Sequence, residues 1–364
     1  MKVAIVHEWL SVYGGSERVT EIFHEIFPDA PIYCLVYDED SMPDRFKGYD
    51  IRTTFIQKMP FAKKKYQNYL PMMPRAYEEL NLIDYDLVIS SSSACAKGVI
   101  TRSDALHICY CHTPTRYLWE FYYEYIKGMG KIKKAAVSRF IHKLRMWDRL
   151  AADRVDYFIA NSNYIAGRIN KYYSRDSKVI FPPVNTHMYN VSEDDGDYYL
   201  VVSRLVPYKR IDIAVEAFNK LGLNLIVIGD GPQRGKLEAI AGTNVKIMGR
   251  LSDEEISEYY SRCKAFIFPG EEDFGITPVE AQASGRPVIA YGRGGALDTV
   301  LDGMTGLFFN EQSVESLSEA VNRFESAGVV YSKNEIKEYS DKFSVDRFKK
   351  EIQEYIYETL SKKQ

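Results

Sequence analysis

Two carboxylates in the C-terminal half of the chain, Glu272 and Glu280, are eight residues apart on either side of a glycine and a Thr-Pro step. The apolar residues 264–269 just before them predict a short buried strand. Thr277 and Pro278 then predict the start of a helix, with the threonine as N-cap and the proline as the first helical residue. Both carboxylates therefore belong to a turn that leads from a strand into a helix.

The backbone of this turn suits an anion. The N–H groups of Gly275, Ile276 and Thr277 have no partner inside the expected helix, and such groups bind phosphate. Two carboxylates would repel the phosphate itself, so we expect them to bind the hydroxyl groups of a ribose and a sugar at its two ends. The alternative is a structural role, in which Glu280 closes a Thr-x-x-Glu capping box.

Two cations, Arg204 and Lys209, follow the apolar residues 198–202, which predict another strand. An arginine and a lysine at the end of a strand can neutralise a diphosphate leaving group, and arginine can do so with two parallel hydrogen bonds. The alternative is ordinary solvated surface charge, and these two residues alone do not decide between the two interpretations.

Together these features resemble the retaining glycosyltransferases of family 4, which have the GT-B fold. The resemblance covers nearly the whole chain and rests on four motifs in the family's order: 13–17 (Tyr-Gly-Gly-Ser-Glu), 111–116 (Cys-His-Thr-Pro-Thr-Arg), the Arg-x4-Lys pair Arg204 and Lys209, and the Glu-x7-Glu pair Glu272 and Glu280. Residues 85–93 and 112–119 are similar, more narrowly, to bacterial and archaeal mannosyltransferases of O-antigen and exopolysaccharide assembly.

The resemblance implies a site for a nucleotide-diphosphate sugar. It assigns acceptor binding to Arg116 and Tyr117, with contact to the diphosphate as the alternative for Arg116. It assigns catalysis to His112, Glu272, Arg204 and Lys209. In this assignment His112 contacts the transferred sugar. It assigns donor binding to a larger set, most of which follows strands: Gly14, Gly15, Arg204, Lys209, Gly249, Arg250, Leu251, Glu272, Phe274, Gly275, Ile276, Thr277 and Glu280.

The same resemblance favours GDP-mannose as donor and a glycan or a polyprenyl-diphosphate-linked saccharide as acceptor. The alternatives are a UDP-sugar-dependent transferase for glucose, galactose or N-acetylglucosamine, and a nucleotide-sugar epimerase of the same fold. Arg204 and Lys209 supply the positive charge that a metal would supply, so we expect transfer without a metal and without a cofactor besides the donor. The Asp-x-Asp patterns at 38–40 and 84–86 are interpreted as incidental.

Alternation of apolar strands with helical stretches predicts α/β architecture, with parallel sheets covered on both faces. Strands are expected at 2–7, 31–36, 87–90, 106–111, 157–161 and 179–181, and again at 198–203, 224–229, 245–249, 265–269 and 287–291. We expect two doubly wound, Rossmann-like domains facing across a cleft: an acceptor-binding domain at 1–190 and a nucleotide-sugar-binding domain at 191–345. The family implies that a C-terminal helix at 346–364 packs back on the first domain.

Length, charge and cysteine content narrow the class of protein further. A length of 364 residues favours two domains, and a net charge of −3 gives no general attraction to nucleic acid. The sequence contains no run of 18 apolar residues, so we expect no membrane-spanning helix. His7 and Glu8 interrupt the N-terminal apolar run too early for a signal peptide. Five cysteines without an export signal favour reduced thiols and a cytoplasmic protein.

Two basic stretches, 58–66 and 127–145, interleave lysines and arginines with apolar residues. This pattern suits either peripheral binding to an anionic membrane surface or a solvated helix face, and both interpretations stay open. Two other classes of protein fit less well. A dehydrogenase needs a Gly-x-Gly-x-x-Gly turn, but Arg234 stands where the third glycine of Gly229-Asp-Gly231 would be. A two-lobed sugar-binding protein would require export.

Overall fold

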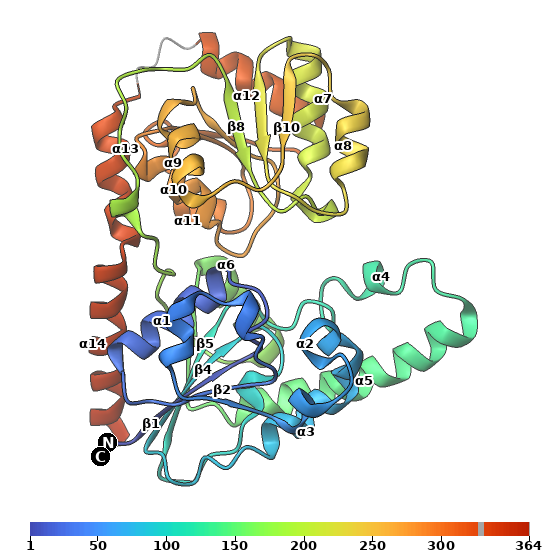
Figure 1. Cartoon of the computed structure of the whole chain (residues 1–364), viewed down its shortest axis with the longest axis vertical. Coiled ribbons are helices and arrows are strands. Elements are labelled where there is room, and N and C mark those ends of the chain that lie inside the picture. The colour runs from blue at the N-terminus through green and yellow to red at the C-terminus, as the bar shows by residue number, and fades with distance from the viewer. Residues whose placement is uncertain (327–330, 364) are drawn as a thin grey trace. The chain divides into compact units, whose positions relative to one another are not determined.

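The computed structural model describes residues 1–326 and 331–363, and for Glu124, Tyr125 and Ile132 it describes the backbone only. The chain divides into two compact units (Figure 1). The first takes in Met1–Phe181 and the chain from Lys349 onward, and the second is Pro182–Phe348. Each unit has its own parallel sheet with its own helices, which confirms the expected fold class of two Rossmann-like domains.

The sheet of the first unit has the strand order β3-β2-β1-β4-β5-β6-β7, and neighbouring strands are parallel throughout. Its strands are β1 (Val3–His7), β2 (Ile32–Cys34), β3 (Ile51–Thr53), β4 (Leu87–Ser92), β5 (Leu106–Cys111), β6 (Tyr157–Ala160) and β7 (Ser177–Val179). Its helices are α1 (Gly15–Ile26), α2 (Ala62–Lys65), α3 (Met73–Glu78), α4 (Tyr122–Tyr125), α5 (Lys131–Asp153) and α6 (Asn163–Tyr173).

The sheet of the second unit has the order β10-β9-β8-β11-β12-β13. Its strands are β8 (Tyr199–Val202), β9 (Leu225–Ile228), β10 (Val245–Met248), β11 (Phe266–Phe268), β12 (Val288–Tyr291) and β13 (Gly306–Phe309). Its helices are α7 (Ile211–Leu221), α8 (Arg234–Ile240), α9 (Asp253–Arg262), α10 (Ile276–Ala283), α11 (Ala296–Thr299), α12 (Val314–Ser326) and α13 (Lys333–Ser340).

The inner strands of the second sheet are covered on both faces, which explains why β8, β9, β11 and β12 are continuously apolar. Along β8, Tyr199 and Val201 pack in one core cluster with Phe218 of α7. Leu200, between them, packs in another cluster with Tyr260 of α9. Successive side chains of a strand point to opposite faces, so each face of the sheet has its own helical layer.

Sequence patterns missed two strands, β3 and β13. Each is at the edge of its sheet and has three or four residues, too few to establish a period. By its contacts the chain joins the second unit at Pro182, whereas the expected boundary lies after residue 190. Val184 donates its backbone N–H to Phe343 at 2.9 Å, and the ring of Tyr189 packs against that of Tyr260.

The C-terminal helix α14 (Val345–Lys363) begins in the second unit and continues in the first. Its apolar stripe, Phe348, Ile352 and Ile356, is buried. In the first unit, Lys349 pairs with Glu25 of α1 at 2.7 Å. The chain thus crosses between the units at two places, near residue 182 and near residue 349.

Candidate active site

The turn between β11 and α10 carries the motif with the two carboxylates. α10 begins at Ile276 and its N-cap is Gly275, which has a φ of +91°. The prediction of Thr277 as N-cap was therefore wrong, because a left-handed glycine starts the helix earlier than the Thr-Pro step indicates. Pro278 instead lies in the first helical turn, where its missing N–H leaves no helical bond unmade.

Glu272 of this turn forms an ion pair with Lys209, although the two residues are far apart in the sequence. Lys209 ends a short 3-10 helix, Pro207–Lys209, that follows β8, and Glu272 follows β11, the neighbouring strand. The side chain of Lys209 is 18% exposed and that of Glu272 is 12% exposed, so the pair is largely shielded from water. Arg204, from the same loop as Lys209, is exposed and donates to the Tyr208 hydroxyl at 3.2 Å.

Glu280 lies on α10 and is buried. It accepts a hydrogen bond of 3.0 Å from the hydroxyl of Tyr260, which comes from α9. Burial, and then the negative charge of Glu280, hold the pKa of Tyr260 well above its usual range, so the tyrosine remains a donor. The capping-box alternative for Glu280 fails, because Thr277 is not the N-cap. Tyr260 was missed because no motif relates it to Glu280.

The glycine-rich turn after β12 packs against the backbone of Glu272–Phe274. Gly295 donates its N–H to the carbonyl of Glu272 at 2.8 Å. A Cβ atom on Gly295 would lie 2.2 Å from Cα of Phe274. A Cβ atom on Gly294 would lie 2.4 Å from the backbone carbonyl oxygen of Glu272. These glycines are therefore required for close contact between two stretches of backbone.

The β10–α9 loop contains the remaining donor-binding candidates of the second unit. Gly249 accepts a hydrogen bond from the backbone of Gly229 at 3.2 Å, which joins this loop to the turn after β9. Arg250 is exposed, and Leu251 is partly buried against the core. α9 then begins with a complete capping box formed by Ser252 and Glu255.

In the first unit, His112 follows β5 and belongs to a chain of side chains that reaches three other elements. Its Nε2 lies 2.8 Å from Oγ of Ser91 on β4, and that oxygen lies 3.1 Å from Nδ1 of His7 on β1. Nε2 of His7 in turn lies 3.2 Å from a carboxylate oxygen of Glu17 on α1. The parallel register aligns His7 with Ser91, which is why residues so distant in sequence meet.

The surroundings of His112 keep its imidazole neutral. Burial, reinforced by His7, lowers the pKa of His112 to about 3. For Glu17, burial raises the pKa, but the hydrogen bond and charge of His7 outweigh it, so the net shift is downward. Gly14 is the N-cap of α1 and Gly15 its first residue, so the predicted glycines place Glu17 in the first turn of the helix.

The loop after His112 is anchored by Asp148 of α5, which is fully buried. Asp148 pairs with Lys97 at 2.5 Å and accepts hydrogen bonds from Thr115 at 2.8 Å and from the indole of Trp119 at 2.9 Å. Between these anchors lie the two acceptor candidates, Arg116 and Tyr117. No local sequence pattern relates Lys97 to Asp148, which are 51 residues apart.

Parallel sheets with polar groups beyond their strand ends define a class of proteins that bind ligands at such edges. Residues 13–187 match a sequence family described as Glycosyltransferase Family 4, and residues 187–343 match the family Glycosyl transferases group 1. The two matches together cover most of both units. The chain therefore belongs to the family 4 glycosyltransferases of the GT-B fold.

Individual relatives support this membership. An uncharacterized glycosyltransferase of Methanocaldococcus jannaschii is 30% identical over 228 residues, 60% of this chain and 64% of that protein. A GDP-mannose-dependent alpha-mannosyltransferase of Mycolicibacterium smegmatis is 36% identical over 200 residues, 52% of this chain and 51% of the relative. Each alignment thus spans less than two thirds of the curated relative.

Among solved structures, HepE of Anabaena in complex with UDP superimposes with a TM-score of 0.73. The match covers 98% of this chain and all of HepE, at 17% sequence identity. At this identity the likeness concerns the fold. Within residues 1–326 and 331–363, no helix is both long and apolar enough to span a membrane.

Proposed function

We propose that the protein is a retaining glycosyltransferase that moves a hexose, mannose from GDP-mannose, to a glycan or polyprenyl-diphosphate-linked acceptor. The observation that carries this proposal is the arrangement around the start of α10. Glu272 in the turn before α10 pairs with Lys209 from the loop after β8, and the buried Glu280 lies on α10 itself. The backbone N–H groups at the start of α10 suit a diphosphate.

The proposed roles follow from the charges. Arg204 and Lys209 stabilise the negative charge that grows on the leaving diphosphate, and in this reaction they act in place of a metal. Glu280 binds the ribose, and Glu272, which also orients Lys209, binds the sugar. His112, held neutral, contacts the transferred sugar. The departing phosphate oxygen accepts the proton of the attacking hydroxyl, so the new bond forms on the same face and no protein base is needed.

The choice of donor rests on likeness to relatives. GDP-mannose is favoured because a relative at 36% identity is named for its dependence on it. A UDP-sugar donor is the second candidate, because the neighbouring HepE structure holds UDP. The residues around Gly249–Leu251, where the family implies that the base lies, offer mainly backbone groups and so do not select between the two.

The test is a transfer assay with a polyprenyl-diphosphate-linked N-acetylglucosamine, EDTA and either GDP-mannose or UDP-glucose. We expect release of GDP, and NMR of the product should show the anomeric configuration of the donor. Release of UDP alone would contradict the donor assignment, and inversion at the anomeric carbon would contradict the retaining mechanism. Activity that requires added manganese would contradict metal independence. Glu272→Ala, which should abolish release, controls for contaminating hydrolases.

We also propose peripheral binding to an anionic membrane at the cytoplasmic face. Lys131, Lys133, Lys134, Arg139 and Lys143 of α5 are all exposed. Each cation near such a surface contributes about 1 kcal/mol, so changing Lys131, Lys133 and Lys134 to Glu should release the protein from anionic vesicles. Equal sedimentation of this variant and the wild type with the vesicles would show that these lysines are ordinary solvated charges.

A further inference from the structure

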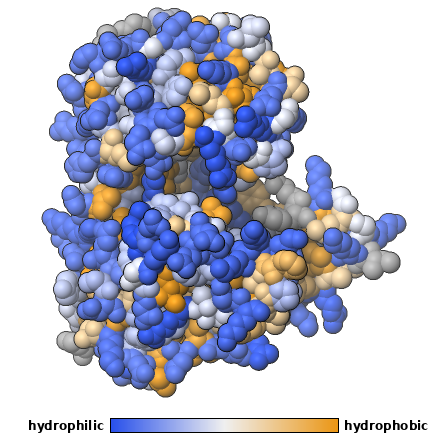
Figure 2. All heavy atoms as spheres, in the orientation of Figure 1, coloured by the Kyte–Doolittle hydropathy of each residue, from blue (hydrophilic) through white to orange (hydrophobic). Residues whose placement is uncertain are grey.

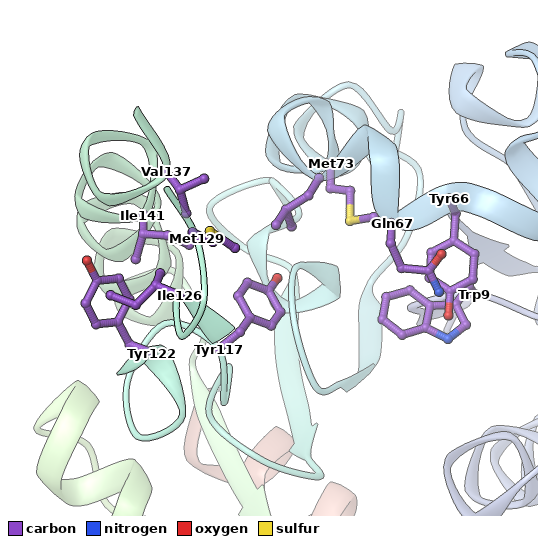
Figure 3. A pocket seen from close by; sticks show the side chains of 11 residues that line it. Trp9, Tyr66, Gln67, Met73, Tyr117, Tyr122, Ile126, Met129, Val137 and Ile141 are labelled. Atoms are coloured by element: carbon purple, nitrogen blue, oxygen red, sulfur yellow. The ribbon is translucent and has the colours of Figure 1, made fainter. Parts of the chain in front are cut away.

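An apolar pocket of about 400 Å³ opens in the first unit, between the 3-10 helix Tyr66–Met72, α5 and the segment that connects Tyr117 to α5 (Figure 3). Of the described residues that line it, only Gln67 lacks an apolar or aromatic side chain. The others are Trp9, Tyr66, Leu70, Met73, Tyr117, Tyr122, Ile126, Met129, Val137 and Ile141. The volume falls within the range of small-molecule sites.

Cations flank the apolar lining. The guanidinium of Arg145 lies 4.6 Å from the ring centre of Tyr122. Lys133 and Lys134 precede Val137 by one helical turn, so they share its side of α5, and both are exposed. On the opposite wall, the exposed Lys65 directly precedes Tyr66. Figure 2 shows apolar residues gathered among hydrophilic ones on the part of this unit that carries α2 and α5.

We infer that this pocket binds the hydrocarbon chain of an anionic amphiphile, with its phosphate among Lys65, Lys133, Lys134 and Arg145. An apolar interior takes an alkyl or isoprenoid chain, and basic groups around the opening attract the charged head. A protein partner would need a much broader contact surface than a pocket of this size offers. The inference deepens the proposed function, since a lipid-linked acceptor has this chemistry, but its test requires no turnover.

Trp9 provides the readout, because its indole lines the pocket and stacks on Tyr66 with 4.5 Å between ring centres. The probe is dodecyl phosphate brominated along its chain, which quenches tryptophan on contact. The amphiphile is added to the 364-residue chain at concentrations below those at which it forms micelles. We expect saturable quenching that disappears in Trp9→Phe. Affinity should rise about fourfold for each added methylene, because each contributes a nearly constant burial free energy.

Two variants on α5 form a matched pair. Val137→Glu places a charge in the pocket and should weaken binding at least tenfold. Leu150→Glu, at a position on the same helix that is 62% exposed, should leave binding unchanged. Changing Lys133 and Lys134 to Glu should weaken binding of dodecyl phosphate but not of the uncharged dodecyl maltoside. Thermal melts and GDP binding of each variant show that the fold and the nucleotide site are intact.

Absence of saturable quenching, or equal losses in Val137→Glu and Leu150→Glu, would overturn the inference. Quenching that appears only with brominated vesicles, and not with the monomeric amphiphile, would assign the surface to membrane adsorption and likewise overturn it. Because GDP binding is measured separately, failure of the pocket is distinguishable from failure of the proposed function.

Discussion

The two units carry polar groups beyond the ends of their parallel strands but hold them in different ways. In the first unit, His112 and the loop after it are held by buried side chains from β1, β4, α1 and α5. In the second unit, the turn that carries Glu272 is held by backbone contacts to Gly294 and Gly295. The first arrangement depends on charge and hydrogen bonding, whereas the second depends on the absence of side chains.

The largest effect is expected from the buried pair in the first unit. Asp148→Asn leaves the Lys97 charge buried without its counter-ion and should lower the free energy of unfolding by about 3–5 kcal/mol. Asp153→Asn, which removes the exposed partner of Arg149 on the same helix, should cost less than about 1 kcal/mol. Urea unfolding checks both variants, and similar losses would contradict the role given to Asp148.

In the second unit, Lys209→Ala should reduce turnover and leave the fold intact. Removing one electrostatic stabiliser of a leaving group costs about 3 kcal/mol, or roughly a hundredfold in kcat. The rate of GDP release from GDP-mannose measures it. A rise in KM with unchanged kcat would show that Lys209 binds the donor equally before and during reaction, which contradicts our interpretation.

The glycine contacts are tested by Gly295→Ala. Its Cβ would meet the backbone of Phe274, so we expect a loss of about 1–3 kcal/mol in stability together with weaker GDP binding. Gly235 in α8 is the matched control, because no atom beyond the neighbouring backbone of its own helix lies within 4 Å of its added Cβ. Gly235→Ala should stabilise the protein by about 0.4–1 kcal/mol. If Gly295→Ala changed neither stability nor GDP binding, the turn would be free to shift, which contradicts the required close contact.

The histidines of the first unit predict a pH dependence. The folded protein holds the pKa of His112 at about 3 and that of His107 at about 4, both because of burial. Unfolded histidine has a pKa near 6.5, so acid favours the unfolded state. The stability that depends on these neutral histidines is therefore fully present above about pH 6.5. As the pH drops toward 4, the free energy of unfolding falls by about 1.4 kcal/mol per pH unit for each histidine. Unfolding of His112→Gln between pH 7.5 and 5 should show a shallower slope, and an unchanged slope would contradict the neutral His112.

Short motifs explain why the second unit was the easier one to predict. Glu272 and Glu280 lie within one turn and one helix, so their spacing alone suggested a site. The start of α10 was misjudged because the positive φ of Gly275 is a tertiary property, set by its neighbours. Tyr260 and the Lys209–Glu272 pair were missed because they join elements whose proximity depends on strand order.

In the first unit the sequence revealed strands and the glycines at the start of α1, but not the series of side chains that links His112 to Glu17. Its members are on β1, β4 and α1, and no local spacing relates them. The parallel register supplies that relation by aligning His7 with Ser91. Buried networks of this kind become predictable only once the strand order is known.

The central claim is that the second unit binds a nucleotide-sugar donor through Glu280 and its neighbours. Calorimetric titration of GDP-mannose into the 364-residue chain in EDTA tests it most directly, with Glu280→Ala titrated in parallel. We predict binding by the wild type and an affinity about ten- to a hundredfold lower in the variant, the effect of losing a hydrogen bond to a charged group. Equal affinity of the two proteins, or no binding of either GDP-mannose or UDP-glucose by the wild type, would contradict the account.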